Sequence, residues 1–92
     1  MYVRVIRYLL NKSAFDRDFI LDDVFRVDGL HIDYANNNIK WPRVIIFWDN
    51  RNKGEDICFT RQKDANDFYT QILVGLKNGE TLLELDARPM QL

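Results

Sequence analysis

A run of apolar residues at 44–48, VIIFW, most constrains the fold of this chain. It follows Trp41 and Pro42 and leads into a polar segment at 49–56. The run is too short for an ordinary helix, and every member is β-branched or aromatic, which favours a strand. Because no polar residue alternates with the apolar ones, we expect a strand that is covered on both faces.

Other segments are predicted to supply partner strands for this run. Residues 2–10 are rich in Val, Ile and Tyr and have no N-cap residue before them, so we expect an opening strand there. A helix is the alternative, because the same residues also form an apolar face when wound at helical spacing. Further strands are expected at 39–48, 57–59 and 82–85, with the polar segment 49–56 as a loop.

The pair Asp28-Gly29 predicts a type I′ hairpin over residues 23–35, because both turn positions need a positive φ. Folding the chain about this pair places Phe25 opposite Ile32 on a mostly apolar face. The hairpin would therefore have an inner and an outer side.

Local signals are weaker in three other segments. Ser13 and Asp16 predict a short turn of helix that extends to Leu21, because both side chains can cap free N–H groups. The three asparagines at 36–38 predict a turn. The tail at 88–92 is expected to be loose.

The strongest periodic pattern predicts one long helix over residues 61–78. Apolar residues recur at spacings of three and four: Ala65, Phe68, Tyr69, Ile72, Leu73 and Leu76. Thr60 is the expected N-cap, and Asn78-Gly79 is expected to end the helix in a left-handed turn. Gly75, inside the helix, would allow a close approach of another segment.

These elements predict an α+β fold. We expect an antiparallel β-meander of about four to six strands, with the helix at about 61–78 packed on one face. A chain of 92 residues is expected to form one compact domain over 1–92.

Composition disfavours several classes of function. Lys and Arg total 13 against 14 Asp and Glu, so the basic excess typical of nucleic-acid-binding domains is missing from the total. The single cysteine, Cys58, cannot form an intramolecular disulfide, which favours a reducing, cytoplasmic location. Neither a signal-peptide pattern nor an apolar stretch long enough to span a bilayer is present, so no membrane association is expected.

The residues that could support catalysis or metal binding form no recognisable pattern. Cys58 and His31 are the one nucleophile–base candidate, but Cys58 lies between Ile57 and Phe59, where a buried thiol is the ordinary interpretation. His31 and Asp33 are too few ligands for a zinc site. We therefore expect no catalytic residues, no metal and no cofactor.

Two further clusters have an ordinary explanation. The aspartates between Asp16 and Asp28 lack the alternation and the closing Glu of a calcium loop. The loop around Arg51 and Lys53 lacks a P-loop pattern, and acidic neighbours cancel its charge.

The predicted function is therefore non-catalytic binding of another protein, which includes a second copy of this chain as a homodimer. Aromatic residues make up 13% of the chain, more than one small core needs, and aromatic residues are enriched at protein interfaces. The size suggests an inhibitor or accessory protein from a phage or another mobile element. One alternative is a single-stranded nucleic-acid-binding module that stacks bases on Tyr34, Trp41 and Phe47. The other is a Cys-dependent enzyme.

The binding surface is predicted on the side of residues 44–48 that the helix does not cover. One helix covers one face of a sheet, so the opposite side needs another cover. If Ile45 and Phe47 face the helix, the opposite side is either covered by residues 2–10 and 13–21 of the same chain or free to contact a partner. The predicted partner-binding residues are Trp41, Arg43, Val44, Ile46, Trp48 and Arg51.

Overall fold

The computed structural model describes residues 1–10, 17–27, 32–35, 41–48 and 53–91. The elements in chain order are β1 (Tyr2–Leu10), β2 (Arg17–Arg26), β3 (Ile32–Ala35), β4 (Arg43–Trp48), β5 (Lys53–Cys58), α1 (Gln62–Lys77), β6 (Leu82–Asp86) and the 3-10 helix η1 (Arg88–Gln91). The described residues thus contain one α-helix and six strands, and the predicted α+β class is confirmed.

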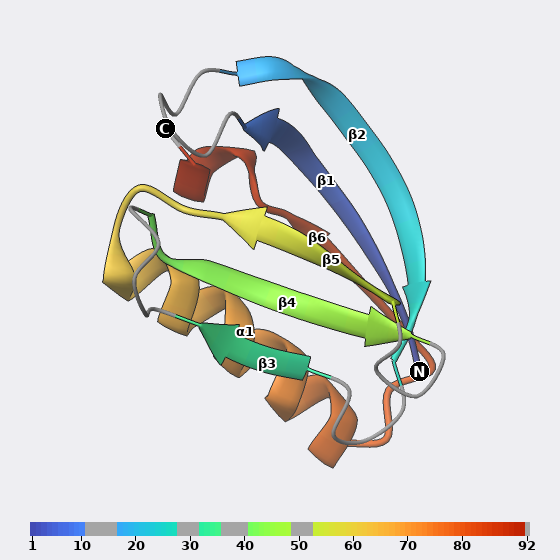
Figure 1. The fold of residues 1–92 in the computed structure, drawn as a ribbon. Helices are drawn as coiled ribbons and strands as arrows, with labels where there is room; N and C mark the ends of the chain where they lie inside the picture. The colour runs from blue at the N-terminus through green and yellow to red at the C-terminus, as the bar shows by residue number, and fades with distance from the viewer. Residues whose placement is uncertain (11–16, 28–31, 36–40, 49–52, 92) are drawn as a thin grey trace.

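The strands form two small sheets rather than one continuous meander. One sheet has the order β2-β1-β6, and the other has the order β3-β4-β5. In the first, β1 is antiparallel to β2 but parallel to β6, whereas β4 is antiparallel to both of its neighbours. Figure 1 shows β3, β4 and β5 in front of α1, with β1 and β2 to one side. Each sheet is therefore smaller than the predicted one.

Both sheets and the helix share one hydrophobic cluster. Its buried members are Val3, Val5, Phe25, Val27, Val44, Ile46, Ile57, Phe59, Ala65, Phe68, Ile72, Leu85 and Ala87. The odd-numbered residues of β1 from Val3 to Arg7 are buried, while the even-numbered residues from Tyr2 to Tyr8 stay at least partly exposed, as expected for a strand with one covered face. Residues 2–10 are therefore a strand, and the helical alternative is excluded.

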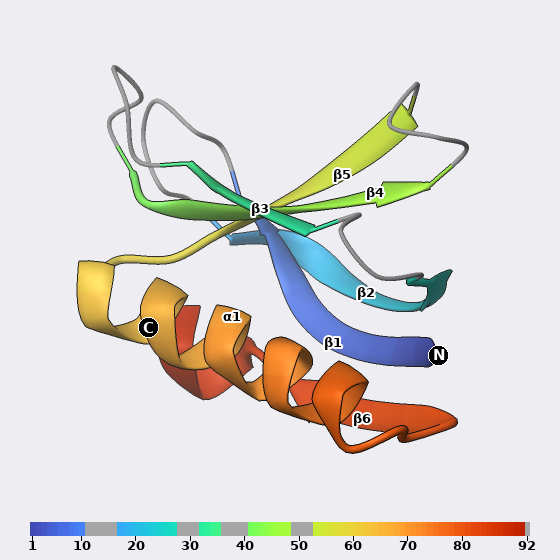
Figure 2. The same cartoon turned by 90° about the horizontal axis from the view of Figure 1, so that it is seen from below.

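Helix α1 packs against the β3-β4-β5 sheet on one side and β6 on the other. Figure 2 shows it below β3 and β4 and beside β6. A Cβ atom added to Gly75 would lie 3.2 Å from Cδ2 of Leu83 and 3.4 Å from the Met1 sulfur. Gly75 is thus the point where Met1, just before β1, and Leu83 of β6 approach the helix, as the sequence predicted.

The ends of α1 agree closely with the prediction. The N-cap is Arg61, one residue after the predicted Thr60, and its side chain makes no capping hydrogen bond. Gly79 has a φ of 72°, the left-handed conformation that ends many helices.

The predicted direction of the β4 side chains was wrong. Val44 and Ile46 are fully buried in the shared core, whereas Ile45 is partly buried on the opposite face. Val44 pairs with the buried Ile57, and paired residues of neighbouring strands point to the same face. The run is apolar at every position, so its pattern could not show which alternate residues would face the helix.

The predicted hairpin over 23–35 was also wrong. Strands β2 and β3 belong to different sheets, and Phe25 pairs with Val3 rather than Ile32. Ile32 pairs instead with Ile46 of β4. The long antiparallel ladder between β1 and β2 buries Phe25 and Val27, and four-residue β3 could not match it. The turn residues 28–31 lie outside the described part.

Three other local predictions were wrong. Residues 17–21 belong to β2 instead of a helical turn; Ser13, Asp16 and the turn at 36–38 lie outside the described residues. The strand β5 begins at Lys53, inside the predicted loop 49–56. The tail is not loose, because η1 is ordered and Gln91 is buried.

We predict that Ile46→Ala lowers the free energy of unfolding by about 3 kcal/mol, because it removes a fully buried side chain. The neighbouring change Ile45→Ala is the matched control and should cost about 1 kcal/mol, since Ile45 is only partly buried. Urea unfolding of both variants measures the difference. Equal losses would contradict the side-chain direction described for β4.

Candidate functional site

The structure separates the residues that were predicted to bind a partner. Val44 and Ile46 lie in the core, where a partner cannot reach them in the folded protein. Trp41 and Arg43 are partly buried at the start of β4. The backbone of Trp48 ends β4, but its side chain and all of Arg51 lie outside the described part. Of the described residues in this set, the buried Val44 and Ile46 therefore share no exposed surface with Trp41 and Arg43.

The outward face of β4 and β5 contains an ion pair. Nη1 of Arg43 donates to a carboxylate oxygen of Asp56 at 2.7 Å, and Ile45 is paired with Asp56 on the same face. Both charged side chains are largely buried, with 17% and 21% of their surfaces exposed. On this face, the charge of Arg43 is therefore already balanced by the carboxylate of Asp56.

The two sheets meet at a seam. There, the side chain of Gln91 makes hydrogen bonds to the backbone that a neighbouring strand would otherwise make. Its Oε1 accepts from the Tyr8 N–H at 2.8 Å, beyond the point where β6 stops pairing with β1. Its Nε2 donates to the Tyr8 carbonyl at 3.4 Å and to the Cys58 carbonyl at 2.6 Å. One buried amide thereby satisfies backbone groups of both β1 and β5.

A buried arginine crosses the same seam. Nη2 of Arg7, on β1, lies 3.2 Å from the Asp23 carboxylate on β2 and 3.1 Å from the Glu55 carboxylate on β5. The guanidinium also lies over the Phe25 ring, 5.4 Å from its centroid. With only 2% of its side chain exposed, Arg7 ties three strands together from inside.

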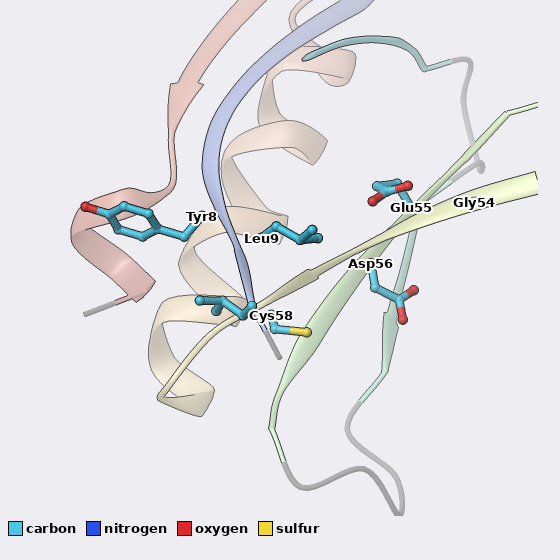
Figure 3. A pocket seen from close by; sticks show the side chains of 7 residues that line it. Tyr8, Leu9, Gly54, Glu55, Asp56 and Cys58 are labelled. Carbon is cyan, nitrogen blue, oxygen red and sulfur yellow. The ribbon is translucent and has the colours of Figure 1, made fainter. Parts of the chain in front are cut away.

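A pocket of about 330 Å³ opens beside the seam, between the end of β1 and the edge of β5. Figure 3 shows Leu9 directed toward the β5 side of this pocket and Tyr8 directed away from it. The wall on β5 includes Glu55, Asp56 and the buried Cys58. The predicted base, His31, lies outside the described residues, so no catalytic pair is assembled around this thiol in the part that the structure describes.

Among the strand residues whose side chains the structure describes, exposed apolar groups gather on the outer face of the β2-β1-β6 sheet. Tyr2, Arg4, Ile6 and Tyr8 of β1 lie on it, and the strand register places Ile20, Val24 and Leu82 on the same side. Tyr2, Ile20, Val24 and Leu82 each expose half or more of their surface. We call these four residues the apolar outer patch. Residue alternation in β1 was the sequence signal that could have identified this face.

Arg4 forms the centre of this face. Its Nε and Nη2 donate to both carboxylate oxygens of Asp22 at 2.9 and 2.7 Å, and its Nη1 donates to Glu84 at 3.0 Å. The hydrogen bonds that Arg4 donates to Asp22 and Glu84 raise the pKa of Arg4, and the bonds that Asp22 accepts from it lower the pKa of Asp22. Three strands thus hold a bidentate ion pair in a fixed position.

No family model, curated protein or solved structure matches this chain. Within the described ranges, no group of three or more His, Cys, Asp or Glu residues could hold a metal ion. Nor is any helix in those ranges long and apolar enough to cross a membrane.

We predict that Gln91→Met, which keeps the length but removes the amide, lowers the free energy of unfolding by about 2 kcal/mol or more. The reason is that backbone groups of Tyr8 and Cys58 lose their hydrogen-bond partner in a buried position. Gln71→Met on the exposed face of α1 is the control and should change stability little. Thermal and urea unfolding give the comparison, and equal effects would argue against the Gln91 contacts.

We predict that Asp22→Asn flattens the acid limb of the stability curve. The pKa of Asp22 in the folded chain lies below its usual value of 3.8, so its stabilising effect is present above that pH. It is lost as the pH falls through the lower folded value. Arg4→Gln should flatten the same limb, and the double variant should add little. Urea unfolding at a series of pH values tests this, and a limb of unchanged slope in Asp22→Asn would refute it.

Proposed function

We propose that this chain is a non-catalytic protein that acts by binding another protein. The observation that supports this most is the open outer face of the β2-β1-β6 sheet, where the apolar outer patch lies on the same side as Arg4. Clustered exposed apolar side chains on a small domain are typical of interaction surfaces.

The patch has the composition expected of an interface. Tyr2 and Leu82 are register partners at one end of the face, and each exposes about half of its surface. Tyr is an amphipathic, rotamer-poor side chain that is enriched among interface hot spots, as is Arg. Because Arg4 is already held by Asp22 and Glu84, a partner would meet a preorganised surface.

Two alternatives have less support. For single-stranded nucleic acid, the basic groups that should track a backbone, Arg4 and Arg43, are each paired with carboxylates. For a Cys-dependent enzyme, the Cys58 thiol is buried, whereas a reactive thiol needs access.

Within the class of protein-binding proteins, we propose an inhibitor or accessory protein of a phage or mobile element, acting in the cytoplasm. This narrower proposal rests on the chain length and the lone cysteine alone. The surface argument does not depend on it.

We predict that the double variant Tyr2→Ser/Leu82→Ser loses its protein partner while it keeps its melting temperature within a few degrees. Both side chains lie on the open face and bury little of the core. Affinity capture from the source cells, followed by hydrogen-exchange mapping of the captured complex, measures binding and locates it.

The control is Leu73→Ser/Val74→Ser on α1, which removes similarly exposed apolar side chains from another face. It should retain the partner. If the β1/β6 variant retains the partner as well as the wild type, or if protection appears elsewhere, the proposed surface is wrong.

A further inference from the structure

We infer that Arg17, which lies over the ring of Tyr8 at one end of the outer face, binds a carboxylate of the partner protein. The partner segment would therefore carry an Asp or Glu residue beside apolar residues. This inference rests on the proposed function and deepens it, because Ile20 of the apolar outer patch is the register partner of Tyr8.

Arg17 lies on the outer face because of its contact with Tyr8. Its Cζ atom is 5.1 Å from the centroid of the Tyr8 ring, which is a cation–π contact. Tyr8 is on the same side of β1 as Tyr2 and Arg4, and Figure 3 shows its ring directed away from the pocket at the seam. Ile20, beside Tyr8, exposes 55% of its surface. The charge of Arg17 thus lies next to an aromatic ring and an exposed apolar side chain.

Two other arginines near this face already bind carboxylates of the chain. Arg4 uses three N–H groups on Asp22 and Glu84. Arg88, which follows β6, donates to both carboxylate oxygens of Asp86 at 2.9 and 2.7 Å. Neither arginine therefore has an unbalanced charge to offer to a partner.

Arg17 differs from them, because none of the described residues gives it a carboxylate partner. Its interaction with the described part of the chain is the contact with the Tyr8 ring. Arg26, near the other end of β2, has an interaction within the chain and is not a free cation. Arg17 is exposed, so its positive charge faces the solvent. This end of the outer face therefore has an unbalanced positive charge.

The contact with Tyr8 positions the guanidinium without using its hydrogen-bond donors. A ring attracts the cation through its π face, whereas the N–H groups of a guanidinium lie in the plane of that group. These N–H groups can therefore donate two parallel hydrogen bonds to a carboxylate, the geometry that this pair favours. Because the ring already restricts the side chain, less entropy is lost when a partner binds.

A single unbalanced arginine favours a carboxylate of a protein over the backbone of a nucleic acid. A nucleic acid repeats its phosphate at every nucleotide, so its binding groove needs several basic groups in a row. On the described outer face, Arg4 and Arg88 bind carboxylates and supply no such row. The exposed Ile20 instead suits an apolar side chain next to the acid of the partner.

Selection of peptides from a randomised display library on the immobilised full chain tests this partner chemistry. The wild type should enrich peptides that carry one Asp or Glu beside apolar residues. Arg17→Glu should lose these peptides and enrich peptides with Lys or Arg at that position, because the charge of the site is reversed. Lys77→Glu is the matched control, since it reverses an exposed basic side chain on α1. It should leave the preference for an acid unchanged.

Synthetic peptides from the selection measure the size of the effect. Changing the acid of the peptide to the matching amide should raise the dissociation constant of the wild type at least about tenfold. The same change should have little effect on Arg17→Gln, which has already lost the charge. Tyr8→Phe keeps the ring and should bind like the wild type, whereas Tyr8→Leu should bind about as weakly as Arg17→Gln. Thermal unfolding of each variant checks that it is folded.

Two results would overturn the inferred role of Arg17: enrichment on the wild type of peptides without an acid, or an unchanged preference for an acid in Arg17→Glu. Competition with the peptides by a single-stranded oligonucleotide would overturn it as well.

Failure of the proposed function gives a different result. Apolar peptides without an acid that still need Tyr2 and Leu82 would remove only the role of Arg17 and leave the proposed surface intact. Retention of the captured partner by Tyr2→Ser/Leu82→Ser tests the proposed surface itself.

Discussion

The Gln91 side chain joins the two sheets, and the rest of the structure depends on this contact. Among the described strands, β1 and β5 share no backbone ladder, yet the end of one approaches the edge of the other. The amide of Gln91 satisfies Tyr8 on β1 and Cys58 on β5 at once. Without it, buried backbone groups on both sides of the seam would each lose a hydrogen bond, which costs more than a lost hydrogen bond at the surface.

Arg7 also connects the two sheets, in this case through ion pairs. These ion pairs help to explain why β5 contains charged residues. The carboxylate of Glu55 receives Arg7 from the side of the core, and that of Asp56 receives Arg43 on the other face. An edge strand with such side chains looks like a loop in sequence, because its stabilising partners lie on distant segments. The buried arginine is stabilised by Asp23 and Glu55 together, since a buried charge needs compensation.

Closing the core at this seam leaves one sheet face open. Helix α1 and the β3-β4-β5 sheet cover the odd-numbered residues of β1, so Tyr2, Arg4 and Ile6 remain on the outside. The ion pairs of Arg4 with Asp22 and Glu84 then hold that outer face in a fixed arrangement. The proposed binding surface follows from this one-sided closure.

Local patterns predicted the elements whose stability is local. The helix, its end at Gly79 and the strand 82–85 were all predicted within a residue or two, because apolar spacing and a left-handed glycine act within a few residues. The hairpin about Asp28-Gly29 failed for the opposite reason. A favourable turn is worth little when Phe25 and Val27 are buried more fully beside β1.

The candidate site could be predicted only in part. Aromatic and arginine residues indicated a binding surface, but the proposed residues on β4 were placed on the wrong side, because an unbroken apolar run gives no sign of its covered face. In β1, by contrast, buried and exposed positions alternate and so indicate which face is covered: Arg4 and Arg7 point to opposite faces.

The sequence by itself determined the α+β class, the helix and the apolar segments that must be buried, because these depend on spacing and local conformation. Only the tertiary structure decided which strands pair, which side of β4 faces the helix, and that Gln91 and Arg7 close the seam. Those outcomes depend on contacts between residues far apart in the chain, such as Tyr8 and Gln91, which no local pattern encodes.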